Sequence, residues 1–293
     1  MPGGVEPSNL EKIFWPDSGL TKGDLLDYFD AIADVILPAL RDRPLTVKRY
    51  PDGIDGFSFF QKNTPKYAPD WVKTVPLWAG SARRDVHYTL CNSKRTLLWL
   101  ANQAAIELHP WLSRTGRLDQ PDHLVFDLDP PPGQFDVAVK VALAMKELLD
   151  HHRIEGVVKT SGAKGIHVYI PIQRRFDYRA AREAAANLAQ EVEERLPEVV
   201  TTEVRLAKRR GRLFLDIGRN APGAHIVAPY SPRARSAATV SFPVAWDELR
   251  TVRPERFTIR TVPKIIGERG DVWKELMPRP QDLSALLSRA AAS

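Results

Sequence analysis

The chain of 293 residues is long enough for one large domain or two smaller ones. Its 42 Lys and Arg against 36 Asp and Glu give a formal net charge of +6, a mild excess that fits a nucleic-acid or phosphate-rich partner without requiring one. A single cysteine excludes a disulfide framework and a cysteine-based zinc site. Neither a signal-peptide pattern nor an apolar run of about 18 residues is present, so a reducing cytoplasm is the expected location.

The N-terminal part predicts a helix, two strands and a second helix. Residues 19–40 form the first helix, with Thr21 as its cap and Asp24 three residues later. A strand beginning at Val47 and a strand around "FSFFQK" follow, separated by a Pro-Asp-Gly turn. Residues 93–111 predict a helix that ends near His109.

The second part predicts strands and helices in the order strand, helix, strand, strand, helix, strand. These segments are 123–129, 136–152, the two strands of 157–172, 178–196 and 212–220, and "AHIVAPYS" at 224–231 predicts a further strand. The order is that of a split βαβ unit. We therefore expect an α/β (α+β) fold in one domain spanning 1–293, with an α/β N-terminal half at 1–115 and a catalytic half at 116–293, and no flexible linker between the halves.

Two aspartates end the strand "HLVFDLD" on one face. Side chains alternate along a strand, so Asp127 and Asp129 point away from Leu124, Phe126 and Leu128. Two residues span roughly 6.6 Å along a strand, a spacing at which carboxylates converge on divalent cations such as Mg²⁺ or Mn²⁺. The alternative is purely structural, with Asp127 capping a turn and Asp129 opening the "DPPPG" loop.

A third acid, Asp216, lies inside the apolar strand "RLFLDIGRN". A charge buried in an apolar strand is costly unless it is paired or bound to metal. Arg212 or Arg219 is a candidate structural partner for this carboxylate. Three aspartates on strands nevertheless favour a two-metal site for phosphoryl transfer.

Between these aspartates lies a glycine-rich turn, "KTSGAKGIHVYIP". Its exposed N–H groups suit phosphate oxygens, although the spacing is not that of a P-loop. Ser161 and Lys164 offer a hydroxyl and an ammonium in the turn, and His167 follows on the next strand. Taken one by one, these residues are more typical of a hairpin loop with a solvated lysine and of a hydrogen-bonded core histidine. Their place beside three aspartates favours a nucleoside triphosphate site.

Several ordered motifs together resemble the polymerase domain of bacterial ligase D, in the archaeo-eukaryotic primase superfamily. They are "GLTKGDLLDYF", "RPLTVKRYPDG", "FFQK", "AAIELHPW", "PDHLVFDLDP", "KTSGAKGIHVYIP", "RLFLDIGRN" and "VAPYSPRAR", and they cover nearly the whole chain. The resemblance implies template-dependent addition of nucleotides, preferably ribonucleotides, to DNA 3′ ends in gap filling, priming or end joining. It implies two Mn²⁺ or Mg²⁺ ions, gapped or primer-template DNA with a 5′-phosphate, and a nucleoid-associated location. A DNA ligase and a Ku-type end-binding protein are the partners it suggests.

The resemblance also assigns roles by position. Asp127, Asp129 and Asp216 match the metal-binding triad. The nucleotide contacts are Lys48, Phe60 or Phe59, His109, Ser161, Lys164, His167 and Arg233, with Arg219 and Arg235 as nearby candidates. The positions that hold a downstream 5′-phosphate are Asn9, Lys12 and Lys22. Pro232 departs from the family, which usually has a larger apolar residue before the arginine at 233.

Some of these residues have an interpretation of their own. Lys22 falls in the first turn of a helix, where free N–H groups already favour phosphate, although a single lysine is more often solvated. Because Phe59 and Phe60 are consecutive on a strand, one is expected in the core and the other as a stacking platform or a steric gate against ribose. "KRRGR" at 208–212 is either a clamp for a nucleic-acid backbone or a solvated hairpin tip.

The absence of a ligase motif narrows the possible functions further. A nucleotidyl-transferring ligase needs a K-x-D-G lysine, and the nearest match has Tyr50 in its place. The chain is therefore expected to be a stand-alone polymerase or one domain of a larger protein. A metal-dependent glycosyltransferase also uses D-x-D but leaves Asp216 and the Lys12–Lys22 pair unexplained. A non-catalytic DNA-end-binding module is disfavoured because all three aspartates are intact.

Overall fold

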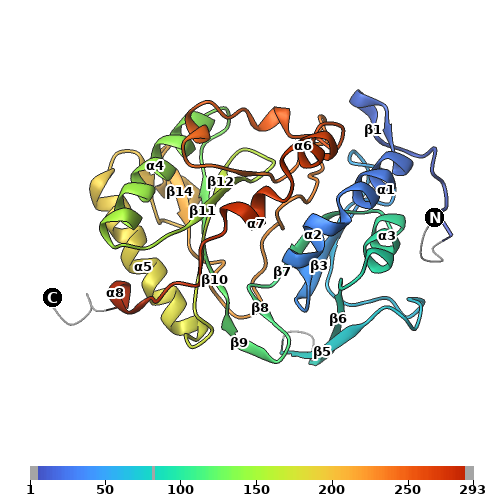
Figure 1. The fold of residues 1–293 in the computed structure, drawn as a ribbon, viewed down its shortest axis with the longest axis horizontal. Coiled ribbons are helices and arrows are strands. Elements are labelled where there is room, and N and C mark those ends of the chain that lie inside the picture. Colours follow the sequence, from blue (N-terminus) through green and yellow to red (C-terminus); the bar gives the residue numbers. More distant parts are fainter. Residues whose placement is uncertain (1–5, 81–82, 288–293) are drawn as a thin grey trace. The chain divides into compact units, whose positions relative to one another are not determined.

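A computed structural model describes residues 6–80 and 83–287, and the chain forms two compact units. Unit 1 comprises Met1–Thr115, His225–Phe242 and Arg253–Asp271. Unit 2 comprises Gly116–Ala224, Pro243–Val252 and Val272–Ser293. Both units mix helices and strands, as expected for an α/β protein (Figure 1). No helix in the described residues is long and apolar enough to cross a membrane.

Unit 1 is built on a five-stranded sheet. Four of its strands lie in the order β4-β3-β6-β5, and β7 also pairs with β3. These strands are β3 (Pro44–Arg49), β4 (Phe59–Gln61), β5 (Thr74–Ala79), β6 (Arg84–Leu90) and β7 (Ala105–Pro110). The other elements are β1 (Ile13–Trp15), β2 (Leu20–Thr21), α1 (Lys22–Ala31), α2 (Ala33–Leu40), α3 (Lys94–Asn102), β8 (Ser113–Arg114), α6 (Val262–Arg269) and the 3-10 helices η1 (Pro16–Ser18) and η4 (Pro254–Arg256).

The first predicted helix is present but divided. The Thr21 side chain accepts a hydrogen bond from the Asp24 N–H and the Asp24 side chain accepts one from the Thr21 N–H, so the capping box is confirmed. Ile32 then leaves the helical conformation, and the segment continues as α2. The stripe of Leu25, Tyr28, Phe29 and Ile32 is buried, as the helical periodicity predicts.

Two predictions in unit 1 are wrong. The helix expected over 93–111 ends at Asn102, because Ala104 adopts a left-handed conformation with φ 62°, and Ala105–Pro110 is the strand β7. His109 is therefore a strand residue. Every β7 residue is buried. Its sequence alternates apolar Ile106 and Leu108 with polar Glu107 and His109, but this alternation spans only four residues and directly follows a helical pattern. The segment 224–231 forms no regular strand; His225 only makes an isolated bridge with Trp111.

Unit 2 contains the predicted split βαβ unit. Its six-stranded sheet has the order β13-β14-β10-β12-β11-β15. The strands are β10 (His123–Asp129), β11 (Val157–Thr160), β12 (Ile166–Pro171), β13 (Val200–Thr201), β14 (Leu213–Asp216) and β15 (Pro243–Val244). The other elements are β9 (Arg117–Pro121), α4 (Phe135–His151), α5 (Tyr178–Arg195), α7 (Val272–Leu276), α8 (Ser284–Leu287) and the 3-10 helices η2 (Leu206–Lys208) and η3 (Glu248–Arg250).

The helices α4 and α5 lie side by side, and both contact β10 (Figure 1). Leu124, Phe126 and Leu128 of this strand are fully buried, whereas Asp127 and Asp129 are only half-buried. Since side chains alternate along a strand, the two carboxylates lie on the opposite side of the sheet from the three apolar residues. The fold thus leaves these two carboxylates partly accessible on one side of an otherwise buried sheet.

Candidate active site

Four chemically active side chains form a row across the sheet of unit 2. Strand register places Asp216 beside Asp127, Asp127 beside His167, and His167 beside Lys159, on β14, β10, β12 and β11 in turn. Residues directly opposite on antiparallel strands have Cβ atoms about 5 Å apart, so their side chains interact on one side of the sheet. The two aspartates predicted to share a site from separate strands are therefore brought together.

A chain of hydrogen bonds and ion pairs connects this row. Lys159, which is fully buried, has its Nζ 2.8 Å from His167 Nδ1, and His167 Nε2 lies 3.3 Å from Asp127 Oδ1. Burial alone would raise the pKa of the Asp127 carboxyl, but His167, Arg219 and Lys159 outweigh it and hold the pKa below its ordinary value. Asp127 is therefore ionised at neutral pH, as a metal ligand must be.

Basic side chains also face the other two carboxylates. Arg219 Nε lies 3.4 Å from Asp216 Oδ2 and 3.8 Å from Asp127 Oδ2. Lys164 Nζ lies 3.0 Å from Asp129 Oδ1, and Arg209 Nη1 lies 4.0 Å from Asp129 Oδ2. The structural partner considered for Asp216 is thus Arg219 and not Arg212, which bonds to backbone carbonyls elsewhere.

The turn between β11 and β12 holds its shape through Ser161 and Gly165. The Ser161 Oγ accepts hydrogen bonds from the Ala163 and Gly165 N–H groups at 3.1 and 3.0 Å. A Cβ on Gly165 would lie 2.2 Å from the Leu128 carbonyl oxygen, so only glycine allows the turn to approach β10 this closely. This approach places Lys164 beside Asp129.

The three carboxylates in and beside this row are chemically suited to bind a divalent cation. Three carboxylates on two adjacent strands are hard oxygen ligands of the kind that Mg²⁺ and Mn²⁺ prefer. As they stand, no three His, Cys, Asp or Glu side chains among the described residues are arranged to hold a metal ion. Lys164 and Arg219, whose side chains are 44% and 42% exposed, supply the balancing positive charge, and both are exposed enough to move aside for a cation.

In unit 1, the sheet presents a second group of predicted residues. Lys48 on β3 is paired in register with Phe60 on β4 and with Glu107 on β7, and His109 lies two residues beyond Glu107. Lys48 Nζ lies 5.4 Å from the Phe60 ring centroid. The rings of Phe60, His109 and His225 contact one another with centroids 5.5 to 5.8 Å apart. Three of the predicted nucleotide contacts therefore meet on one side of this sheet.

The expectation that either Phe59 or Phe60 is a core residue is wrong. Phe60 is 53% exposed, and Phe59 is half-buried against Phe57, with the Arg49 guanidinium 5.5 Å from its ring centroid. The strand β4 is only three residues long and lies at the edge of its sheet, so neither of its sides is fully covered. Both rings are accessible for stacking.

Glu107 lies among the basic side chains of this group in unit 1 and is 5% exposed. Its Oε2 is 3.0 Å from His109 Nε2 and 3.3 Å from Arg233 Nε. Burial would raise the pKa of Glu107, but the His109 hydrogen bond and the Arg233 charge lower it to about 2. Burial and the neighbouring Glu107 raise the pKa of the Tyr50 hydroxyl, so that tyrosine stays neutral.

The loop that carries Arg233 and Arg235 is anchored to the same sheet. The Leu108 N–H donates to Ser231 Oγ at 2.9 Å, and the Ala234 N–H donates to Glu107 Oε1 at 3.3 Å. Pro232, the departure from the family pattern, makes an isolated bridge with Val240. The proline therefore sits in ordered backbone, immediately before an arginine that pairs with Glu107.

The residues predicted to hold a 5′-phosphate gather at the start of α1. The Lys22 N–H donates to the Lys12 carbonyl, and the Lys12 N–H donates to the Asn9 carbonyl. Lys22 is 5% exposed, its Nζ donates to the Ser8 carbonyl at 2.6 Å, and its pKa is lowered by burial and by the charges of Lys12 and Arg49. The expectation of a freely solvated Lys22 does not hold. Lys12 pairs with Asp52 at 2.6 Å.

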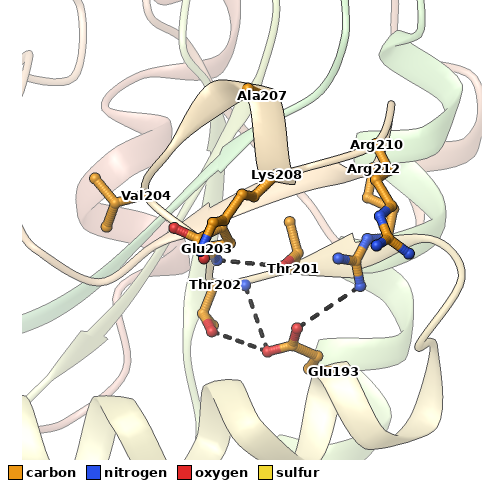
Figure 2. Close-up of a pocket in the computed structure, with 9 residues that line it drawn as sticks. All are labelled: Glu193, Thr201, Thr202, Glu203, Val204, Ala207, Lys208, Arg210 and Arg212. Carbon is orange, nitrogen blue, oxygen red and sulfur yellow. Dashed lines mark hydrogen bonds and ion pairs between the residues drawn. The ribbon is translucent and has the colours of Figure 1, made fainter.

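The basic segment 208–212 lines a pocket of about 890 Å³ in unit 2 (Figure 2). Lys208, Arg210 and Arg212 face it together with Glu193 and Glu203. Glu193 accepts hydrogen bonds from Thr202 and lies 3.9 Å from Arg212. Because two carboxylates offset three cations, the pocket has little net charge, and its composition does not define a phosphate site.

Sequence reasoning missed two buried charges, Lys159 and Glu107. Lys159 lies two residues before Ser161, which follows directly after the end of β11, and Glu107 lies two residues before His109 on the same side of β7. That alternation was a usable signal for Lys159. For Glu107 it was hidden by the incorrect helix prediction over 93–111.

Comparisons with known proteins show the family of the chain. The family model of the LigD primase-polymerase domain matches residues 21–273. The chain is 38% identical over 286 residues to the bifunctional non-homologous end joining protein LigD of Bacillus subtilis, covering 96% of this chain and 46% of that protein. It is 32% identical over 275 residues to the multifunctional non-homologous end joining protein LigD of Mycolicibacterium smegmatis, covering 93% and 36%. The polymerase domain from Mycobacterium tuberculosis ligase D in complex with DNA superposes with a TM-score of 0.86 at 32% identity, covering 94% of this chain and 98% of that one.

These similarities define a nucleotidyltransferase of the polymerase class. The chain belongs to the LigD primase-polymerase domain family, and the resemblance inferred from its motifs is confirmed. It spans about half the length of the Bacillus relative and about a third of the mycobacterial one. The glycosyltransferase alternative finds no support in these similarities.

Proposed function

We propose that the chain is a template-dependent polymerase that adds nucleotides, preferably ribonucleotides, to DNA 3′ ends during gap filling in end joining. The observation that carries this proposal is the register pairing of Asp216 with Asp127 on a polar side of the sheet, in a chain similar to a DNA-bound polymerase domain. A DNA ligase and a Ku-type end-binding protein are the proposed partners, because the relatives carry the name of non-homologous end joining proteins.

In this proposal Asp127, Asp129 and Asp216 hold two divalent cations, Mn²⁺ or Mg²⁺. The cations would supply charge neutralisation at the triphosphate and lower the pKa of the primer 3′-OH. His167, held by Lys159, orients Asp127. When nucleotide binds, Lys164 and Arg219 exchange the carboxylates for phosphate oxygens.

The nucleotide contacts in unit 1 have separate roles. Phe60, with Phe59 as the alternative, stacks on the base, because an exposed ring offers a sequence-tolerant surface. His109 contacts the sugar, and Lys48, Arg233 and Arg235 bring positive charge to the nucleotide. His109 and Ser161 are polar groups able to hydrogen-bond a ribose hydroxyl, which is the basis for the proposed ribonucleotide preference.

Asn9, Lys12 and Lys22 form the proposed site for the downstream 5′-phosphate. Burial of Lys22 excludes water from its ammonium and strengthens its attraction for an anion. Lys22 also opens α1, at the end of the helix whose dipole favours an anion. A gapped DNA end would therefore be recognised by its phosphate.

The test is extension of a labelled primer on a DNA template with Mn²⁺ and either NTPs or dNTPs. The proposal predicts templated extension that stops when a chelator removes the metal. Turnover of a sugar nucleotide without extension would support a glycosyltransferase. DNA binding with no chemistry under any metal would support a non-catalytic end-binding module.

A further inference from the structure

A buried carboxylate lies where the proposed function requires cations. Glu107 is 5% exposed and shares the sheet of unit 1 with Lys48, His109 and Arg233. A negative charge near a bound triphosphate opposes nucleotide binding. The carboxylate would therefore weaken nucleotide binding at the proposed site unless it also orders the basic side chains around it.

The contacts of Glu107 show that it holds two of these side chains in place. One oxygen, Oε2, faces His109 Nε2 at 3.0 Å and Arg233 Nε at 3.3 Å. The other, Oε1, accepts hydrogen bonds from the Tyr50 hydroxyl and the Ala234 N–H, both at 3.3 Å. Glu107 thus ties a strand residue, His109, to a loop more than a hundred residues later in the chain. It fixes the His109 ring because neutral imidazole must carry its proton on Nε2 to donate to the carboxylate.

We infer that Glu107 is a positioning residue, which holds His109 and Arg233 in the arrangement that receives the nucleotide. The inference rests on the proposed function of these two residues. Glu107 itself does not touch the nucleotide; it limits the motion of two long or rotatable side chains before the ligand arrives. Arg233 largely neutralises the charge of Glu107. The repulsion between Glu107 and a phosphate is therefore small compared with the gain from holding His109 and Arg233 in place.

Replacing the carboxylate by an amide removes the charge while keeping the shape. In Glu107→Gln, the charge that attracts Arg233 is lost, and the amide offers an acceptor oxygen at only one of the two positions, so it cannot hold His109 and the Ala234 N–H together. We expect the Kd for a non-hydrolysable α,β-methylene nucleoside triphosphate, measured by calorimetry on the full chain with Mn²⁺, to rise about tenfold. Glu107→Asp keeps the charge and should recover part of that loss.

A matched control exists in unit 2. Glu191 is 8% exposed and its Oε2 lies 2.8 Å from His152 Nε2, so it is also a buried carboxylate paired with a histidine. Glu191→Gln should leave the Kd for the nucleotide analogue within about twofold of wild type. If a buried carboxylate acts only through general stability, both variants will change the Kd alike.

A double-mutant cycle with Arg233→Ala gives the decisive readout. Because Glu107 acts through Arg233 and His109, Glu107→Gln should weaken binding much less in the Arg233→Ala background than in wild type. Thermal unfolding of each variant confirms that it is folded at the assay temperature. If Glu107→Gln is not folded, Glu107→Asp takes its place in the cycle. A wild-type Kd in a folded Glu107 variant, fully additive effects, or no analogue binding by wild type overturns the inference. Failure of the proposed polymerase function is seen separately, as a wild-type protein that binds the analogue but does not extend a primer.

Discussion

Glu107 should make the stability of the protein depend on pH in acid. The carboxyl has a pKa of about 2 in the folded chain against an ordinary value of 4.5, because its interactions with His109 and Arg233 outweigh the effect of burial. A group with a lowered pKa stabilises the fold fully above its unfolded pKa and loses that contribution as the pH falls towards its folded pKa. At 1.36 kcal/mol for each pKa unit, the lowering corresponds to about 3 kcal/mol at pH 7. Roughly 2 kcal/mol of this is lost between pH 7 and pH 3.

The assay compares urea unfolding of wild type and Glu107→Gln at pH 7 and at pH 3. Other carboxyl groups titrate in both proteins, so the difference between the two isolates Glu107. The variant should be less stable by about 3 kcal/mol at pH 7, in the range for breaking one partner of a buried ion pair, and the gap should shrink to about 1 kcal/mol at pH 3. A gap that stays constant with pH would refute the argument, because it would mean that the carboxylate is not selectively stabilised by its partners in the folded state.

Three further predictions concern DNA binding, sugar selectivity and the core. A gapped DNA with a 5′-phosphate should bind about tenfold more tightly than one with a 5′-hydroxyl, and Lys12→Ala/Lys22→Ala should abolish the difference; a preference that persists would place the phosphate elsewhere. In single-nucleotide insertion with Mn²⁺, kcat/KM for each NTP should equal or exceed that for its dNTP, and a dNTP preference of about tenfold would indicate a steric gate instead. Cys91 is fully buried and its thiol pKa is raised by burial, so Ellman's reagent should react with it only after unfolding; rapid reaction with the native protein would contradict the core described here.

The sheet of unit 2 could be predicted from sequence because its signals are local. Alternation along "HLVFDLD" and "RLFLDIGRN" placed Asp127, Asp129 and Asp216 opposite apolar residues, and the glycine-rich turn marked the hairpin between β11 and β12. The register that pairs Asp127 with Asp216 is a long-range property, set by how β14 returns beside β10. Composition and spacing carry no information about it.

The incorrect helix over 93–111 and the unforeseen contact between Arg233 and Glu107 have a different cause. The strand β7 alternates apolar and polar residues over only four positions, too few to separate it from the end of α3, and the break at Ala104 comes from a backbone conformation that alanine seldom adopts. That error turned Glu107 and His109 into helix-end residues and concealed their pairing. The return of residues 225–242 to unit 1, which brings Arg233 to Glu107, is likewise invisible to any local pattern.

The proposed catalytic role of Asp127 and Asp216, which lie side by side in the row across the sheet of unit 2, is tested most directly by Asp127→Asn. Extension of a labelled primer-template with Mn²⁺ and NTPs is measured for wild type and variant, with DNA affinity measured in parallel. The substitution removes one charged metal ligand while keeping the size of the side chain, so extension should fall at least about a thousandfold, which corresponds to about 4 kcal/mol of transition-state stabilisation. DNA affinity should stay within about threefold of wild type. Extension by the variant at the wild-type rate would contradict the assignment of this row as the catalytic centre.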